Sequence, residues 1–83
     1  MNVEAYPNPF NDQVQVKVNL AHEGRIIVRL INLLGEEMLQ KKIDGEVGGE
    51  NYFSLTTAAL NPGVYILQVI TPDGGYSMKV EKE

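Results

Sequence analysis

Few residues of this chain have side chains suited to catalysis, and their spacing matches no catalytic motif. The chain contains one histidine, His22, and no cysteine, which excludes thiol nucleophiles, thiolate metal sites and disulfides. Its two serines, Ser54 and Ser77, fall at outward-facing positions of predicted strands, whereas His22 falls in a predicted exposed turn. A hydrolase triad would need one serine beside His22 together with an acid, and no supporting motif surrounds these residues. We therefore expect a protein that is not an enzyme.

Acidic and glycine-rich stretches offer no better site for a metal ion or a phosphate group. The segment 44–46, Asp-Gly-Glu, lies in a glycine-rich loop but lacks the alternating oxygen ligands of a calcium loop. The glycine pairs at 48–49 and 74–75 are followed by neither a helix N-terminus nor a phosphate-binding lysine. We expect the chain to bind no metal and no cofactor.

The net charge of −4 argues against a surface that binds nucleic acid. The seven basic residues are scattered, and only Lys41 and Lys42 are adjacent. No apolar run approaches the roughly 18 residues needed to span a bilayer, so we expect no transmembrane segment. Residues 1–4 lack the basic start and apolar stretch of a signal peptide. A secreted origin would therefore require this chain to be part of a longer protein.

A turn and the longest β-type run of the chain define the predicted centre of the fold. Residues 61–64 fit a type II turn, because Pro62 fixes φ at the second position and Gly63 can adopt the positive φ of the third. In residues 64–70 only Gln68 is polar, and the others are β-branched, aromatic or leucine. We predict a central strand covered on both faces, or nearly so.

Further strands are predicted by alternating apolar residues and turn signals. Residues 13–20 and 25–31 are the clearest. A type I turn at 32–35, with Gly35 in the left-handed region, leads to a return strand at 37–43 whose lysines indicate a sheet edge. Shorter strands are predicted at 3–6, 52–55 and 76–81, with a loop at 44–50 and one helical turn near 56–60. The fold class is all-β: an immunoglobulin-like antiparallel β-sandwich of about seven short strands in one domain.

Two groups of apolar side chains have both a structural and a functional interpretation. The aromatic residues could form a sugar-stacking platform, but we expect most to pack in the core and at its rim: Tyr6, Phe10, Tyr52, Phe53, Tyr65 and Tyr76. Leu33 and Leu34, at a predicted hairpin tip, either mark a contact surface or include one leucine that folds back over the core. The pattern favours the second interpretation.

Three stretches, taken in order along the chain, resemble a known family. They are Tyr-Pro-Asn-Pro-Phe at 6–10, Leu-Leu-Gly-Glu at 33–36, and Leu-Asn-Pro-Gly-Val-Tyr-Ile-Leu-Gln-Val at 60–69, which leads to Met-Lys-Val-Glu-Lys at 78–82. Their order, spacing and terminal placement resemble the type A C-terminal sorting domain of the type IX secretion system of Gram-negative bacteria. The resemblance covers nearly the whole chain.

The resemblance implies a non-catalytic secretion signal at the C-terminus of a larger cargo protein. The cargo would reach the periplasm with a cleavable signal peptide, and the folded domain would direct it across the outer membrane to the cell surface or the medium. The implied partners are the translocon and its shuttle proteins, the N-terminally fused cargo, and a sortase-like cysteine protease that removes the domain. The cargo is then anchored to lipopolysaccharide or released.

Carried over position by position, the resemblance implies a set of recognition and architecture residues. They are Pro7, Asn8, Pro9, Gly35, Gly63, Val64, Tyr65, Lys79, Val80 and Lys82. Two prolines so close together favour an extended segment at 6–10, whose flanking aromatic residues could clamp it to the core. Asn32 stands where an aspartate is frequent in the family, and the turn tolerates this because both residues cap it similarly.

The last strand has a predicted inner and outer face. Its even-numbered residues Tyr76, Met78 and Val80 should pack into the sandwich, whereas Lys79 and Lys82 should point into solvent. Acidic residues are interleaved at the end of the chain, where the family is often more apolar or basic.

An assembly or binding module is the alternative function. The flagellar hook-capping protein has a related opening and a related Gly-x-Tyr strand, and similar sandwiches decorate secreted glycosidases as carbohydrate-binding domains. The full-length gene would distinguish a sorting domain from an assembly or binding module, because a sorting domain must lie at the C-terminus of a precursor that has a signal peptide.

Overall fold

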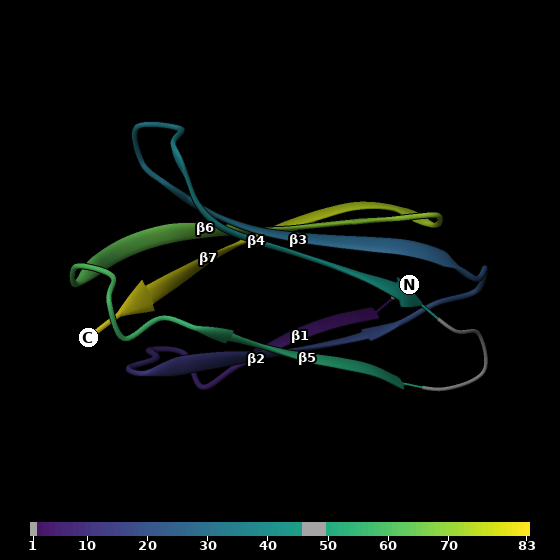
Figure 1. Cartoon of the computed structure of the whole chain (residues 1–83), viewed down its shortest axis with the longest axis horizontal. Coiled ribbons are helices and arrows are strands. Elements are labelled where there is room, and N and C mark those ends of the chain that lie inside the picture. The colour runs from purple at the N-terminus through teal and green to yellow at the C-terminus, as the bar shows by residue number, and fades with distance from the viewer. Residues whose placement is uncertain (1, 46–49) are drawn as a thin grey trace.

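The computed structural model describes residues 2–45 and 50–83, which form two antiparallel sheets packed face to face (Figure 1). One sheet has the order β1-β2-β5 and the other the order β4-β3-β6-β7. The strands are β1 (Asn2–Tyr6), β2 (Gln13–Asn19), β3 (Gly24–Asn32), β4 (Glu37–Gly45), β5 (Glu50–Thr56), β6 (Gly63–Thr71) and β7 (Gly74–Lys82). Pairing of the second strand with the fifth, and of the third with the sixth, is typical of immunoglobulin-like sandwiches. The all-β prediction is confirmed.

The core lies between the two sheets and follows the two-residue period of the strands. Because successive side chains of a strand point to opposite faces, the alternating valines of β2 all reach the core. The fully or almost fully buried apolar side chains include Phe10, Val14, Val16, Val18, Ile26, Val28, Leu30, Leu67, Val69 and Val80. Burial of each such side chain contributes about 1.5–3 kcal/mol to folding, so this layer is the main source of stability.

Strand β6 lies inside its sheet, hydrogen-bonded to β3 on one side and β7 on the other, as predicted. The prediction that both its faces are covered is wrong. Tyr65, Leu67 and Val69 are buried against the other sheet. The outward residues of β6 are half-buried or exposed: Val64, Ile66, Gln68 and Ile70. An apolar residue that is half-buried on an open sheet face gives the same sequence pattern as one under a second layer.

The two glycine turns differ in how closely they follow the prediction. Gly35 has φ +87° and its N–H donates to the carbonyl oxygen of Asn32 over 3.0 Å, which confirms the predicted hairpin turn. Gly63 has φ +148°, which is positive as expected but far from the +80° or so of a type II turn. The type II prediction is therefore wrong in geometry, because Gly63 already begins β6. Only glycine adopts either φ readily.

Strand β4 is an edge strand, as its lysines indicate. Asp44 and Gly45 extend this strand and Glu50 begins β5, so the predicted loop at 44–50 starts too early and ends too late. Residues 46–49, including Glu46 of the weak calcium-loop candidate, lie outside the described residues. Near 56–60 the chain makes a single turn closed by the Leu60 N–H and the Thr57 carbonyl oxygen over 3.0 Å. Among the described residues, no helix is long and apolar enough to cross a membrane.

Candidate recognition surface

The Pro-Asn-Pro-Phe segment lies along the outer edge of β7, the last strand of its sheet. The Phe10 N–H donates to the Glu81 carbonyl oxygen over 2.8 Å, and the Glu83 N–H donates to the Phe10 carbonyl oxygen over 2.9 Å. Phe10 thereby forms a parallel bridge with Lys82. The first and last motif stretches of the sequence therefore lie against each other in the fold. This contact was not predicted from the sequence.

Asn8 covers the next part of the same edge with its side chain. Its Oδ1 accepts from the Glu81 N–H over 3.0 Å, and its Nδ2 donates to the Lys79 carbonyl oxygen over 3.4 Å. Pro7 and Pro9 have no N–H to offer β7, so the amide side chain between them supplies these bonds instead. All three residues remain exposed to solvent.

The segment bends at residues 7–9, so the predicted extended conformation is wrong. The peptide bonds before Pro7 and Pro9 are both cis. The bends place the Asn8 side chain against β7 while Phe10 enters the core. Phe10 is fully buried and clamps the segment as predicted, but Tyr6 is 42% exposed and does not.

The tail of β7 corrects a second prediction. Lys79 is exposed as expected, but Lys82 is 6% exposed and its Nζ donates to the Asn11 carbonyl oxygen over 2.7 Å. Lys82 lies two residues after Val80 and so shares its inward face. The long side chain runs along the end of the core and its ammonium group reaches the turn before β2.

The inward face of β7 is buried progressively along the strand. Val80 is buried and Met78 is half-buried, as predicted. Tyr76 is 42% exposed, so the prediction that it packs into the sandwich is wrong. Tyr76 is paired with the fully buried Val69 of β6, but it lies on the last strand of its sheet.

Tyr65 has a structural role. Its ring is buried and its hydroxyl donates to the Asn61 carbonyl oxygen over 2.6 Å. A tyrosine near the start of the sixth strand that binds backbone a few residues upstream is the tyrosine corner of immunoglobulin-like sandwiches. The Gly-Val-Tyr stretch therefore fixes the crossing between sheets, with Val64 half-buried on the outer face.

The predicted core role of the aromatic residues is right for half of them. Phe10, Phe53 and Tyr65 are buried, whereas Tyr6, Tyr52 and Tyr76 are at least two-fifths exposed. The favoured interpretation of the leucine pair is wrong, because Leu33 is 70% and Leu34 84% exposed. Both leucines stand at the tip of the β3–β4 hairpin, which projects away from the sandwich (Figure 1).

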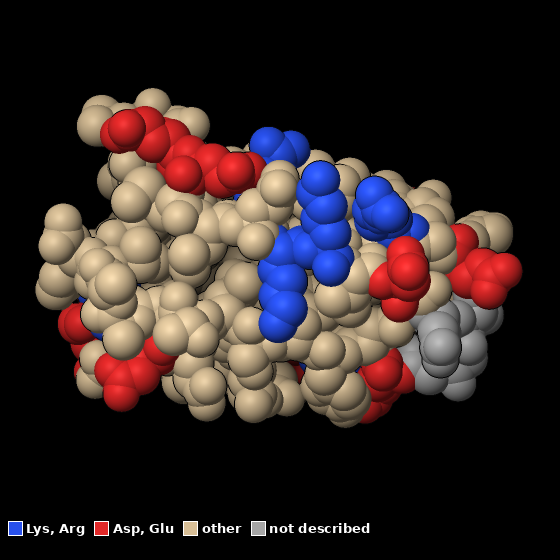
Figure 2. Space-filling view, in the orientation of Figure 1, with Lys and Arg blue, Asp and Glu red and all other residues tan. Residues whose placement is uncertain are grey.

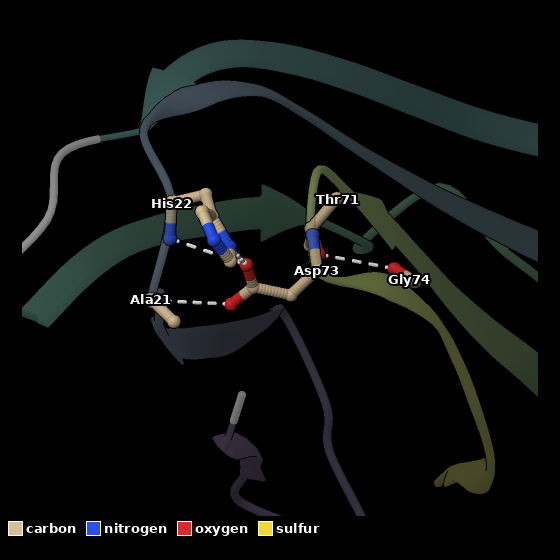
Figure 3. Close-up of polar contacts among 5 residues, drawn as sticks. All are labelled: Ala21, His22, Thr71, Asp73 and Gly74. Carbon is tan, nitrogen blue, oxygen red and sulfur yellow. Dashed lines mark hydrogen bonds and ion pairs between the residues drawn. The ribbon is translucent and has the colours of Figure 1, made fainter.

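His22 belongs to a structural joint between two connections (Figure 3). Asp73, between β6 and β7, accepts from the Ala21 N–H over 2.7 Å and from the His22 N–H over 3.1 Å. The Asp73 carboxylate also lies 2.8 Å from Nδ1 of His22. The Ala21 amide, and then His22, hold the pKa of Asp73 below its usual range. His22 lies in an exposed turn, as predicted, but its partner 51 residues away was not predicted from the sequence.

Thr71 orders the loop that carries Asp73. Its hydroxyl donates to the Gly74 carbonyl oxygen and accepts from the Asp73 N–H, each over 3.0 Å. This side-chain turn aims the Asp73 carboxylate at the β2–β3 connection (Figure 3). The signal in the sequence was the Thr-Pro-Asp-Gly order, which predicted a tight loop but not its contact.

The outer face of the four-stranded sheet carries a shallow hollow of about 260 Å³, lined by residues of β3, β6 and β7. Arg29, Gln68 and Ser77 are among its described lining residues, which include no histidine and no carboxylate. Ser77 therefore has no base there to activate it as a nucleophile. Within the described part of the chain, no three His, Asp or Glu side chains gather in a way that could hold a metal ion.

Charged side chains gather in separate areas of the face shown in Figure 2. Acidic groups follow the projecting hairpin, where Glu36 and Glu37 are exposed, and basic groups lie over the middle of the molecule. On the three-stranded sheet, the Lys17 ammonium group lies 3.2 Å from each of the Glu4 and Glu50 carboxylates. On the face that Figure 2 shows, acidic groups border the basic ones, which does not favour the binding of nucleic acid.

Residues 4–83 match the family described as the secretion system C-terminal sorting domain. The match includes the Pro-Asn-Pro-Phe segment, the projecting hairpin, the tyrosine corner and the last strand. No curated protein matches the chain.

Proposed function

Because this chain belongs to the family of secretion system C-terminal sorting domains of the type IX system, we propose that its folded sandwich is the export signal itself. The domain directs its attached cargo across the outer membrane and performs no chemistry of its own. It is the single C-terminal domain of a larger secreted protein, and it passes through the periplasm on the way to the cell surface or the medium.

The junction between the Pro-Asn-Pro segment and β7 is the observation that supports recognition of a folded surface. Asn8 and Lys79 are 71 residues apart in sequence and meet only after folding. Pro7, Asn8, Pro9 and Lys79 remain exposed around this junction and form the contact surface for a shuttle protein or the translocon. An unfolded chain would not present them together.

The other motif residues maintain the fold of the domain. Tyr65 and Val80 are buried, and Lys82 binds backbone beneath the junction. Gly35 and Gly63 permit the backbone conformations of the hairpin turn and of the start of β6.

After translocation, a sortase-like cysteine protease removes the domain from its N-terminally fused cargo.

The proposal is tested by fusing residues 1–83 behind a signal peptide and a fluorescent passenger in a bacterium that has a type IX system. We expect the passenger at the cell surface or in the medium, and the same passenger without the domain in the periplasm. Retention of the complete fusion in the periplasm, although its domain resists proteolysis as a folded domain does, would reject the proposal.

A further inference from the structure

The tip of the β3–β4 hairpin carries adjacent, highly exposed apolar side chains. Leu33 and Leu34 are the two most exposed large apolar residues described, at 70% and 84%. Met38, 40% exposed, follows them on the return strand. We call Leu33, Leu34 and Met38 the leucine tip. Adjacent apolar side chains kept in water are typical of an interaction surface.

The leucine tip is held in one conformation by Asn32. The Asn32 Oδ1 accepts from the backbone N–H groups of Leu34 and Glu36, both over 2.9 Å. The Asn32 Nδ2 donates to the Glu36 carboxylate over 3.0 Å, and the Asn32 and Gly35 N–H groups close the turn over 3.0 Å each. A tip fixed in this way loses little conformational entropy when it binds.

Acidic groups surround the leucine tip. Glu36 and Glu37 are exposed beside it, and acidic side chains line the hairpin in Figure 2. The Glu37 carboxylate lies 3.8 Å from Nε of Arg29. Acidic groups would be repelled by an anionic membrane surface but attracted by a basic protein surface.

We propose that the leucine tip inserts into an apolar pocket, bordered by lysine or arginine side chains, on a protein component of the secretion machinery. This inference rests on the proposed function and adds a second contact surface, on the β3–β4 hairpin, to the one at the junction at β7. The leucines supply affinity by becoming buried, and the two glutamates orient the tip through the basic border.

The first test replaces both leucines, Leu33→Ser with Leu34→Ser, in the passenger fusion. Export should fall about tenfold or more while the melting temperature of the purified domain stays the same, because these side chains contribute affinity but no core packing. Tyr52→Ser is the matched control, since Tyr52 is 56% exposed on the opposite sheet. It should leave export unchanged.

Two outcomes of this test are distinct. If the unaltered fusion is exported and the leucine variant is exported equally well, the leucine tip is no contact and only this inference fails. If the unaltered fusion is not exported, the proposed function fails, and this inference fails with it. Should the double variant melt early, Leu34→Ser alone, at the more exposed position, is compared in the same assay.

The second test addresses the chemistry of the partner. Glu37→Lys should reduce export, whereas Glu23→Lys, the same charge change at an exposed turn of the β2–β3 connection, should not. Equal export of both variants would overturn the basic border. Sedimentation of the purified domain with phosphatidylethanolamine–phosphatidylglycerol vesicles, lost in the leucine variant, would overturn a protein pocket in favour of a lipid surface.

Discussion

Asn8 and Asn32 use the same chemistry over very different distances along the chain. Each asparagine accepts backbone N–H groups with its Oδ1 and donates with its Nδ2. Asn32 binds groups within six residues of itself, whereas Asn8 binds groups more than 70 residues away. The β3–β4 hairpin is thus closed by its own residues, while the junction at β7 exists only once both ends of the chain are in place.

This difference predicts whether substitutions in each region destabilise it locally or destabilise the whole domain. A hairpin held by local bonds can loosen without releasing the core, because no core strand depends on its tip. The junction at β7 includes the fully buried Phe10 and the buried Lys82, so substitutions there should lower the global free energy of unfolding.

The largest effect is expected for Phe10→Ala, which removes the side chain that anchors the N-terminal segment in the core. It should lower the free energy of unfolding by about 3–5 kcal/mol, out of a total of roughly 4–12 kcal/mol for a domain of 83 residues. Denaturant unfolding measures it. Tyr6→Ala, at the exposed flank of the same segment, is the control and should cost less than about 1 kcal/mol. Similar costs for both variants would show that Phe10 is no anchor.

Lys82→Ala should cost about 1.5–3 kcal/mol, because it removes a charged hydrogen bond to the Asn11 carbonyl oxygen and the packing of the lysine stem. Lys79→Ala, at an exposed position of the same strand, should change the free energy of unfolding by less than about 0.5 kcal/mol. The passenger assay then separates their roles. Reduced export by Lys79→Ala at unchanged stability would assign Lys79 to recognition, and unchanged export would remove it from the contact surface.

The comparison of the two asparagines is tested directly by Asn8→Ala and Asn32→Ala. Each should cost about 1–2 kcal/mol through lost hydrogen bonds, but the amide groups that lose protection should differ. Hydrogen exchange should accelerate at Glu81 in the first variant and at Leu34 and Glu36 in the second. Faster exchange along β7 in the Asn32 variant would contradict a locally closed hairpin.

The smallest effect is a pH dependence at the joint between His22 and Asp73. The pKa of Asp73 is lower in the folded protein than the 3.9 or so of an unfolded aspartate. Its contribution is therefore complete above that value and is lost as the pH falls through the folded pKa. Melting temperatures between pH 7 and pH 2 should fall less steeply for Asp73→Asn than for the unaltered domain.

Glu50 and Asp12 help to interpret this measurement. The pKa of Glu50 is also lowered, by its hydrogen bond from Tyr52 and by Lys17, so some acid sensitivity should remain in the Asp73 variant. Asp12→Asn changes the same charge at an exposed position and should leave the slope unaltered. A slope identical in all three proteins would mean that the joint contributes nothing to stability.

Local signals determined the parts of the fold that depend on neighbouring residues. The alternation of valines in β2 fixed which face reaches the core, because each peptide unit reverses the direction of the next side chain. The spacing of Asn32 and Gly35 likewise predicted the hairpin turn, because all the hydrogen bonds that close the turn lie within four residues. The family motifs were readable in sequence because they are short and ordered.

Only the tertiary structure decided which of those motifs meet and which side chains are covered. The hydrogen bond of Lys82 to Asn11, the exposure of both leucines and the pairing of His22 with Asp73 depend on where distant segments end, which no local period records. That only one face of β6 is covered was also decided by the tertiary structure, because an apolar run in the sequence does not show whether a second layer covers it. The junction of Asn8 with β7 requires the chain to bring its two ends together, and that contact forms only when the whole core places them side by side.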